Sequence, residues 1–365
     1  MEQYIKEKLK EKYLLTFYGK DGNHYGFRFG IPSDAKNLIE IFKDVYGWKY
    51  LYPKVYDVKL FQKSIEKKDQ EWFIVELIKT GELVGTGVME NKNELSVYAG
   101  KTAIKKNNQG IGISKVLGTQ SVFIFLSRPE MKNIIRLDTD VRARNIKVQK
   151  FAEKIRCIPY GFIPNYNNYG DKRNFDISRG HPFSSGEKES VIMYVSPIKN
   201  FWKKRHRNII LLNIDDIIYF YEYVKSFNRN MRKDILTLYN KSIFISEEFK
   251  IKEDYYKSVV LIEGYLHEKT LIKLLKKYSK WNVIEWRIPT SRKGLYSQKI
   301  GLKHGFKIVG YDPGSYSKNN LIRDTLVYCN FPTGIDFNQF EGLDLVKKNE
   351  DMVNKIINSV KEFKK

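Results

Sequence analysis

A glycine-containing turn between a strand and a helix is the feature that most constrains this chain. Residues 94–104 (ELSVYAGKTAI) are rich in residue types that favour strands, and residues 114–126 have helical character. Gly110-Ile111-Gly112 lies between these segments. The first N–H groups of a helix have no intrahelical partner and carry partial positive charge, and glycine lets an anion approach them without meeting a Cβ. The turn is therefore either a simple connection or a seat for a phosphate group.

The segments around this turn predict an α/β chain. Hydrophobic periodicity gives the order β-α-α-β-β-β-α-β-α-β-β up to residue 197. Ser33 or Asp34 is expected to cap the first helix, and Gly47 to end it. Residues 166–188 show no periodicity and are expected to form a functional or disordered loop. The expected strands and helices are, in chain order, residues 24–31, 35–47, 58–67, a hairpin over 71–90, 94–104, 114–126, 133–141, 145–155, 158–165 and 189–197.

Length and composition indicate a globular protein with two domains. A chain of 365 residues exceeds what one compact core usually covers, and its 42% hydrophobic and 14% aromatic content is ample for burial. We assign residues 1–200 to the first domain and residues 201–365 to the second. The charged segment at residues 199–208, which contains a basic cluster at residues 203–207, is expected to be the linker. A short amphipathic helix is expected over residues 2–12.

The charge and the cysteines restrict the partners. A formal net charge of +23 favours anionic partners, which include phosphate-bearing cofactors, acidic proteins and nucleic acid. Because the lysines are scattered, a solvated basic surface is the favoured interpretation and nucleic acid the less favoured one. Cys157 and Cys329 lack metal-ligand spacing, so no metal is expected. The charged N-terminal segment is unlike a signal peptide and no apolar stretch is long enough to span a membrane, which predicts a cytoplasmic protein.

Two segments of the chain resemble each other. QKFAEKIRCIPYGFIPN followed by ESVIMYV parallels SQKIGLKHGFKIVGYDP followed by RDTLVYC. Each places Gln-Lys on a short helix, then Gly-Phe before a strand (Gly161 and Gly305), and ends on a strand that reaches a tyrosine (Tyr194 and Tyr328). Two copies of one supersecondary unit are the favoured interpretation, and chance similarity is the alternative. The second half contains no counterpart of the glycine turn.

The position of the glycine turn resembles the GCN5-related N-acetyltransferase (GNAT) family. A dinucleotide-binding turn would follow the first strand of a parallel βαβ unit, whereas here the glycines follow the fourth strand, behind a hairpin. The resemblance covers roughly residues 25–197 by element order and is carried by NNQGIGISKVL, by Asn145 at the start of the next helix and by YGFIPN. It implies two GNAT-like domains, each a mixed, mostly antiparallel sheet flanked by helices, with the C-terminal one a degenerate copy.

The resemblance also implies a cofactor, acetyl-CoA or another acyl-CoA, whose pyrophosphate sits on the turn. Two departures from the family pattern stand out. Asn107 replaces the first Arg or Gln of the motif, with Lys105 and Lys106 as substitute charges, and Ala152 replaces the tyrosine that often protonates the leaving thiolate. The implied cofactor-binding residues are Ala103, Ile104, Asn108, Gln109, Gly110, Ile111, Gly112, Ile113, Ser114 and Asn145.

Acyl transfer to an amine requires a base, because an unperturbed alkylamine with a pKa of about 10.4 is mostly protonated at neutral pH. Glu94 is the first candidate, with an exposed strand start as the alternative. Asp138 and Asp140, two apart on one strand, project from one face and could line the acceptor pocket or be solvated. Tyr98 is the candidate acid, or a core residue. His181 in the long loop could reach an acceptor.

The sequence therefore predicts an acyl-CoA-dependent N-acyltransferase in which a small-molecule or peptide amine attacks the thioester directly. No activated cysteine points to a covalent intermediate. Two alternatives stay open. One is a non-catalytic protein that binds coenzyme A. The other is an acyltransferase that uses an acyl carrier protein or acts on charged tRNA, whose affinity would fall steeply with salt.

Overall fold

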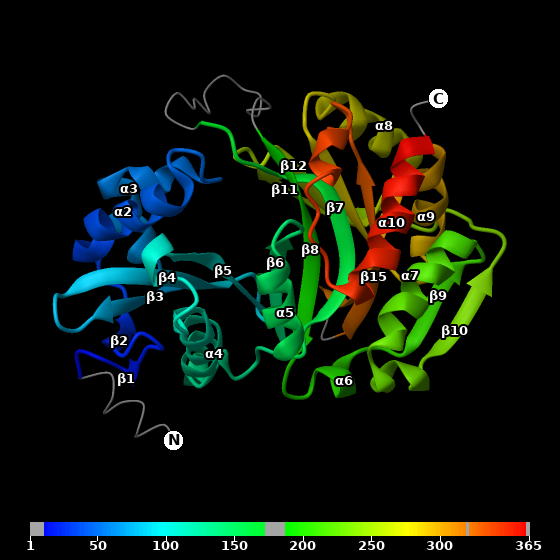
Figure 1. The fold of residues 1–365 in the computed structure, drawn as a ribbon. Coiled ribbons are helices and arrows are strands. Elements are labelled where there is room, and N and C mark those ends of the chain that lie inside the picture. The colour runs from blue at the N-terminus through cyan, green and yellow to red at the C-terminus, as the bar shows by residue number, and fades with distance from the viewer. Residues whose placement is uncertain (1–10, 172–186, 319–320, 363–365) are drawn as a thin grey trace. The chain divides into compact units, whose positions relative to one another are not determined.

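A computed structural model describes residues 11–171, 187–318 and 321–362 of the chain (Figure 1). It consists of two compact units. Unit 1 comprises Met1–Thr139 with Gly170–Phe175, and unit 2 comprises Asp140–Tyr169 with Asp176–Lys365. The division falls inside strand β6 (Arg136–Arg142). We predicted two GNAT-like domains that meet at residue 200. A division into compact units does not show whether the two parts share a fold, so this stays a prediction.

Unit 1 contains a mixed sheet flanked by helices. Its strands β1 to β5 are consecutive antiparallel neighbours, and β6 joins β5 in parallel. Helices α2 and α3 cover one face of this sheet and α4 packs on the other (Figure 1). The bounds are β1 Leu15–Tyr18, β2 His24–Phe29, α2 Ala35–Tyr46, α3 Val58–Ile65, β3 Gln70–Leu77, β4 Glu82–Asn91, β5 Ser96–Ile104 and α4 Ile113–Leu126.

The start of α2 differs from its prediction. Gly47 ends the helix as expected, with φ 58° and its N–H donating to the carbonyl of Lys43. Neither Ser33 nor Asp34 caps it with a side chain, because Pro32–Asp34 forms a separate 3₁₀ turn. The Asp34 carboxylate instead accepts two bonds of 2.8 Å from the buried Arg28 guanidinium. The same carboxylate accepts the Ile31 N–H at 2.8 Å, so Asp34 serves the 3₁₀ turn and the ion pair and not the start of α2.

Unit 2 contains a mostly antiparallel sheet in which, among the described residues, only β12 and β13 are parallel neighbours. Strands β9 and β10 form a separate parallel pair. The strand order is β8 (Lys188–Pro197), β7 (Ile158–Asn168), β14 (Lys307–Lys318), β15 (Leu321–Asn330), β13 (Val283–Pro289), β12 (Val259–Tyr265) and β11 (Glu248–Asp254), with β9 at Asn208–Leu212 and β10 at Ile235–Tyr239. The mixed, mostly antiparallel sheet flanked by helices was predicted, and it is confirmed.

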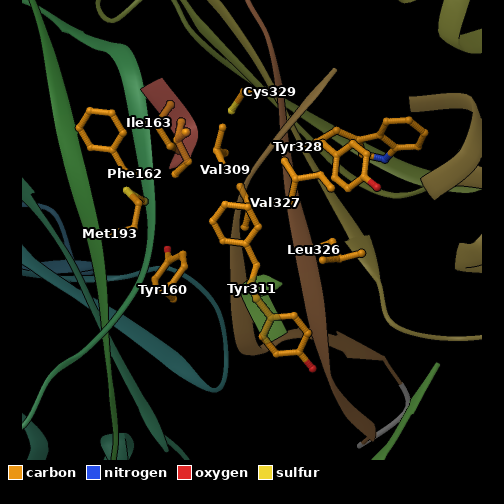
Figure 2. Packing of buried hydrophobic residues seen from close by; sticks show 14 of the residues in the cluster. Tyr160, Phe162, Ile163, Met193, Val309, Tyr311, Leu326, Val327, Tyr328 and Cys329 are labelled. Carbon is orange, nitrogen blue, oxygen red and sulfur yellow. The ribbon is translucent and has the colours of Figure 1, made fainter. Parts of the chain in front are cut away.

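Helices α7 and α10 pack on strands β7 and β14 of this sheet. The core beneath them is dominated by large aromatic and aliphatic side chains of β7, β14 and β15, among them Tyr160, Phe162, Tyr311 and Tyr328 (Figure 2). The helices of unit 2 are α5 Ile146–Lys154, α6 Phe201–Lys204, α7 Asp215–Ser226, α8 Glu268–Lys277, α9 Gly294–Lys303 and α10 Lys347–Lys361.

The two similar sequence segments fold alike. Each gives a helix followed by two antiparallel strands: α5, β7 and β8 in the first, and α9, β14 and β15 in the second. Tyr194 stands opposite Pro159, and Tyr328 stands opposite Ile308. Both predicted tyrosines therefore occupy equivalent positions.

The glycine equivalence proposed from sequence is wrong in detail. Gly161 lies within β7 and pairs directly with Gly310 of β14. A Cβ on Gly310 would stand 2.4 Å from the carbonyl oxygen of Tyr160, so glycine lets these strands approach. Gly305 instead follows α9 with φ 79°, a conformation that Arg156 adopts after α5 with φ 64°. Gly305 therefore ends a helix and has no role at the strand pair.

The Gln-Lys pairs do lie on short helices, and both glutamines are buried anchors. The Gln149 amide oxygen accepts the Val346 N–H at 3.2 Å, and the Gln298 amide oxygen accepts the Leu212 N–H at 2.9 Å. Each glutamine thereby fixes the main chain just before a helix that packs on β7 and β14. This shared use supports the interpretation as one repeated unit.

In the expected linker, Lys203, Lys204 and Arg207 are exposed, but Arg205 is not solvated. Residues 201–204 form α6, and Arg205 is buried with its guanidinium bound to both oxygens of Asp234 at 2.8 Å. Arg205 also donates to Asp324 at 2.7 Å. The predicted helix over 2–12 and His181 fall largely or wholly outside the described residues, and β7 and β8 extend into the ends of the expected loop.

Candidate cofactor and acyl-transfer site

The glycine turn joins β5 to α4 in unit 1. After Ile104 the chain makes a 3₁₀ turn over Lys106–Asn108, and α4 begins directly after Gly112. Gly110 has φ 83° and Gly112 has φ 108°. Residues with a side chain rarely adopt this left-handed region, so the backbone path itself requires glycine at both positions.

Residues 110–114, which we call the cradle, leave main-chain donors unused. Within the described ranges, their N–H groups have no hydrogen-bond partner. The first bonded amide of the helix is that of Lys115, which donates to the carbonyl of Gly112 at 3.1 Å, and no side chain caps the helix. A Cβ built on Gly110 or Gly112 would meet no atom within 4 Å. Donors, helix dipole and open space therefore coincide, which is what a phosphate group needs.

Contacts from distant residues hold the cradle in place. The Lys106 N–H donates to the Asp44 carboxylate at 2.7 Å, and the Lys20 N–H donates to the Ile111 carbonyl at 3.0 Å. On β4, a Cβ at Gly85 would lie 3.0 Å from Ile113, so glycine there lets α4 approach the sheet. Sequence reasoning missed these residues. Only Gly85 carried a signal, because glycine within a strand often marks close backbone approach.

The other predicted cofactor-binding residues divide between the units. Ala103 and Ile104 lie at the end of β5 beside the cradle, and the Gln109 amide donates to the Ile104 carbonyl at 3.1 Å. Asn108 ends the 3₁₀ turn. Asn145 lies in unit 2 and caps α5, since its side chain accepts the Val148 N–H at 3.2 Å. Its binding of the cofactor stays a prediction.

Lysines accompany the cradle. Lys105 is paired with Glu82 at 2.6 Å, and Lys106 and Lys115 have exposed side chains. Asn107 is also exposed. Positive charge is therefore present beside the turn, before and after Asn107, which replaces the Arg or Gln of the family motif.

One edge of strand β5 is open before the cradle, although its other edge pairs with β4. Its parallel pairing with β6 is restricted to Ser96–Tyr98, so among described residues the rest of that edge has no β6 partner. On the β4 side the register shifts between Gly100 and Ala103, and Lys101 within this bulge has φ 51°. A bulge re-aims main-chain and side-chain groups, and bulges recur beside active sites.

Asp138 is fixed in a buried ion pair rather than facing solvent. Its carboxylate accepts from the Arg136 guanidinium at 2.5 and 2.7 Å and from the Lys92 ammonium at 3.0 Å. Burial would raise the pKa of Asp138, but the charges of Arg136 and Lys92 outweigh it and lower the pKa below its usual range. A carboxylate so stabilised is a weak base, which argues against the predicted role.

The remaining predicted catalytic residues lie in different surroundings. Glu94 is exposed in the turn before β5, which begins two residues later at Ser96. The Tyr98 ring lies over Gly100, where a Cβ would stand 2.3 Å from it. Asp140 falls in unit 2, 3.9 Å from the Lys257 ammonium. Ala152 is buried in the core of unit 2 and offers no hydroxyl.

Two histidines and the two cysteines of the chain have structural surroundings. His24 stacks on Tyr18, and the His304 ring nitrogen lies 2.7 Å from Glu268. Cys157 and Cys329 are buried and form no disulfide within the described ranges, and burial raises the pKa of the Cys329 thiol well above its ordinary value. A buried thiol of this kind is a poor nucleophile.

The start of helix α8 in unit 2 differs from the start of α4. Strand β12 leads into α8 through Leu266 and His267 without a glycine turn. The His267 side chain accepts the Lys269 N–H at 3.2 Å and so caps the helix. A protein side chain takes the position that the cradle leaves open.

No helix in the described part of the chain is both long and apolar enough to cross a membrane. The same residues contain no group of three or more His, Cys, Asp or Glu side chains placed to hold a metal ion.

Comparison with solved structures gives matches that cover about half of this chain. It is similar to a ribosomal-protein-S5-alanine acetyltransferase from Vibrio fischeri, with 15% identity over 51% of this chain and 98% of that one and a TM-score of 0.39. A spermidine N-acetyltransferase variant from Vibrio cholerae gives 16% identity, 48% and 95% coverage and a TM-score of 0.37. A ribosomal-protein-S18-alanine N-acetyltransferase from Escherichia coli gives 15%, 48%, 94% and 0.35. No family model and no curated protein matches the chain.

Proposed function

We propose that the protein is an acyl-CoA-dependent N-acyltransferase of the GNAT type. The observation that carries the proposal is the cradle, where unpartnered N–H groups of residues 110–114 lie at the start of a 14-residue helix behind two left-handed glycines. An uncapped helix end beside open space fits a pyrophosphate group. Bound acyl-coenzyme A would supply a thioester activated toward attack by an amine.

The residues of unit 1 take distinct roles in this proposal. Residues 110–114 bind the pyrophosphate, with Lys106 and Lys115 adding positive charge. The open edge of β5 up to Ala103 and Ile104 binds the extended arm through main-chain groups. A main-chain N–H at the bulge polarises the carbonyl that is attacked, which stabilises the developing negative charge.

In this proposal, residues beside the open edge of β5 accept the proton of the amine and protonate the leaving thiolate. Tyr98 is retained as the acid and Glu94 as a carboxylate that could accept the amine proton. Asp138 is left out because its ion pair with Arg136 and Lys92 holds the proton affinity low. The acceptor is a small-molecule or peptide amine, and Asp140 and Asn145 stay as proposed contributors.

We also propose that residues 201–365 derive from a degenerate copy. The paired α–β–β units and the shared glutamine anchors support this origin. The His267 cap on α8 accounts for the loss of an anion seat in that copy.

The test is thiol release from acetyl-CoA and longer acyl-CoAs with a panel of amines and peptides. We expect turnover in wild type and its loss in Gly112→Val, which places a branched side chain in the left-handed turn. Turnover that is unchanged in Gly112→Val would overturn the assignment of the site.

A second candidate is a protein that binds coenzyme A without turnover. Two observations favour it. Ala152, which replaces the family's usual tyrosine acid, is buried and has no hydroxyl, and the Asp138 carboxylate is held in an ion pair with Arg136. Saturable binding of coenzyme A with no thiol release across the whole panel would select this function over the first.

A further inference from the structure

Lys101 occupies an exceptional position in unit 1. It lies in the β5 bulge at φ 51°, and its side chain is only 9% exposed. Its ammonium lies 2.5 Å from a Glu90 carboxylate oxygen, and the Tyr52 ring centroid is 5.9 Å away. Lysine usually keeps its ammonium in water, and desolvating a charge pair gains little net stability. Stability alone therefore gives a weak reason for this arrangement.

The bulge also has a defined relation to the cradle. From Lys101, β5 continues through Ile104 for about 10 Å at 3.3 Å per residue before the chain turns toward Gly110. Along this stretch, β6 offers no partner among the described residues. If the proposed function holds, the pyrophosphate of an acyl-CoA sits on the cradle, its extended arm runs back along β5, and its thioester ends near the bulge. Lys101 carries the one side-chain amine of β5.

We propose that Lys101 is a self-acylation site. Glu90 accepts a proton from the Lys101 ammonium, and the free amine attacks the thioester carbonyl. A C–N bond forms and the C–S bond breaks. The attacking nitrogen gives its second proton to the departing thiolate, which yields free coenzyme A and an amide on Lys101. The amide carries no charge, so acylation removes the ion pair between Lys101 and Glu90.

Glu90 is placed to act in this way. It lies on β4 directly opposite Tyr98, and its side chain is 35% exposed, so a proton can pass from it to solvent. Proton transfer by a positioned carboxylate typically accelerates such a step by about 10²-fold to 10⁴-fold. Removing the Glu90 charge should slow self-acylation by at least the lower of these factors.

The experiment is to incubate the full chain with acetyl-CoA, without any amine, and to map acetylated lysines by mass spectrometry. Lys303 is the internal reference, because it lies 2.7 Å from Glu268 but is 64% exposed in unit 2. We expect acetylation to accumulate on Lys101 well before Lys303. Lys101→Arg, which keeps the charge, should remove that signal, and Glu90→Gln should slow it at least about 100-fold, with circular dichroism checking the fold.

The result that overturns the inference is a rate at Lys101 no higher than at Lys303, or one unaffected by Glu90→Gln. Calorimetry with coenzyme A separates this outcome from failure of the proposed function. Binding of coenzyme A without acetylation of Lys101 refutes the self-acylation alone. Absence of binding refutes the proposed function as well.

Discussion

Replacing Gly110 with valine should weaken the binding of coenzyme A, because the new side chain blocks the cradle and not because the protein unfolds. Gly110 has φ 83°, and a side chain placed there would enter the open space in front of the cradle. Gly81, in the β3–β4 turn, has φ 73° and equally open space where a Cβ would stand, but it has no free helix end beside it. Valine at either position costs roughly 1–2 kcal/mol of folding free energy, because the left-handed region is strained. The two variants are therefore a matched pair.

The magnitude follows from the donors that Gly110→Val would obstruct. A hydrogen bond to a charged group contributes about 1.5–3 kcal/mol. Losing two such bonds from the cradle would cost about 3–6 kcal/mol, which raises the dissociation constant by about 10²-fold to 10⁴-fold. Gly81→Val should leave it within about threefold.

Isothermal titration calorimetry with coenzyme A measures this difference without any turnover, and thermal unfolding checks that both variants lose similar stability. Equal dissociation constants for Gly110→Val and Gly81→Val would refute the assignment of the cradle. A loss of affinity in both variants would show that general destabilisation, and not blockage, controls binding.

Other predictions concern stability and stoichiometry. Asp138→Asn leaves the Arg136 guanidinium buried without its carboxylate and should cost about 3–5 kcal/mol in urea unfolding. Because the pKa of Asp138 is lowered by folding, its stabilisation is present above about pH 4 and fades as the pH falls below that value, so the variant should lose part of the acid dependence. Arg205→Lys removes a bidentate contact and should cost a similar amount by the same measurement. Gly310→Ala should lower the melting temperature, because its Cβ would stand 2.4 Å from the Tyr160 carbonyl oxygen. Calorimetry should give one coenzyme A per chain, and two would contradict the assignment of the cradle as the one binding site.

Local patterns predicted most of the first half of the chain. The order of strands and helices between β2 and β8 is confirmed, because each has the apolar spacing of a half-buried element. Strands β1, β9, β10 and β11 were missed. β11 reads EFKIKED and has a largely exposed pattern, so its charged side chains hide the alternation that identifies a strand.

The cradle was predictable for a related reason. Its chemistry rests on main-chain groups, and their geometry follows from two glycines and the helix start that comes next in the sequence. Catalytic side chains were less predictable because their properties depend on distant partners. Asp138 contacts Lys92, which lies 46 residues earlier, and only the folded sheet brings them together. Nothing in the spacing of Asp138 and Asp140 reveals that one carboxylate is already neutralised.

The two strand-to-helix connections show what distinguishes an open site from a closed one. Every helix leaves its first N–H groups unpaired, and a protein normally satisfies one of them with a side chain, which stabilises the fold by about 0.5–2 kcal/mol. At α8, His267 does so. At α4, Gly112 has no side chain that could accept those hydrogens, so the chain gives up this stabilisation at an exposed turn. Since both helices follow a strand that pairs in parallel with the next one, the difference lies in the residues of the turn and not in the surrounding topology. The missing cap at α4, together with the open space in front of Gly110 and Gly112, leaves the first N–H groups of that helix available to an anion, whereas the His267 cap uses one of those groups at α8.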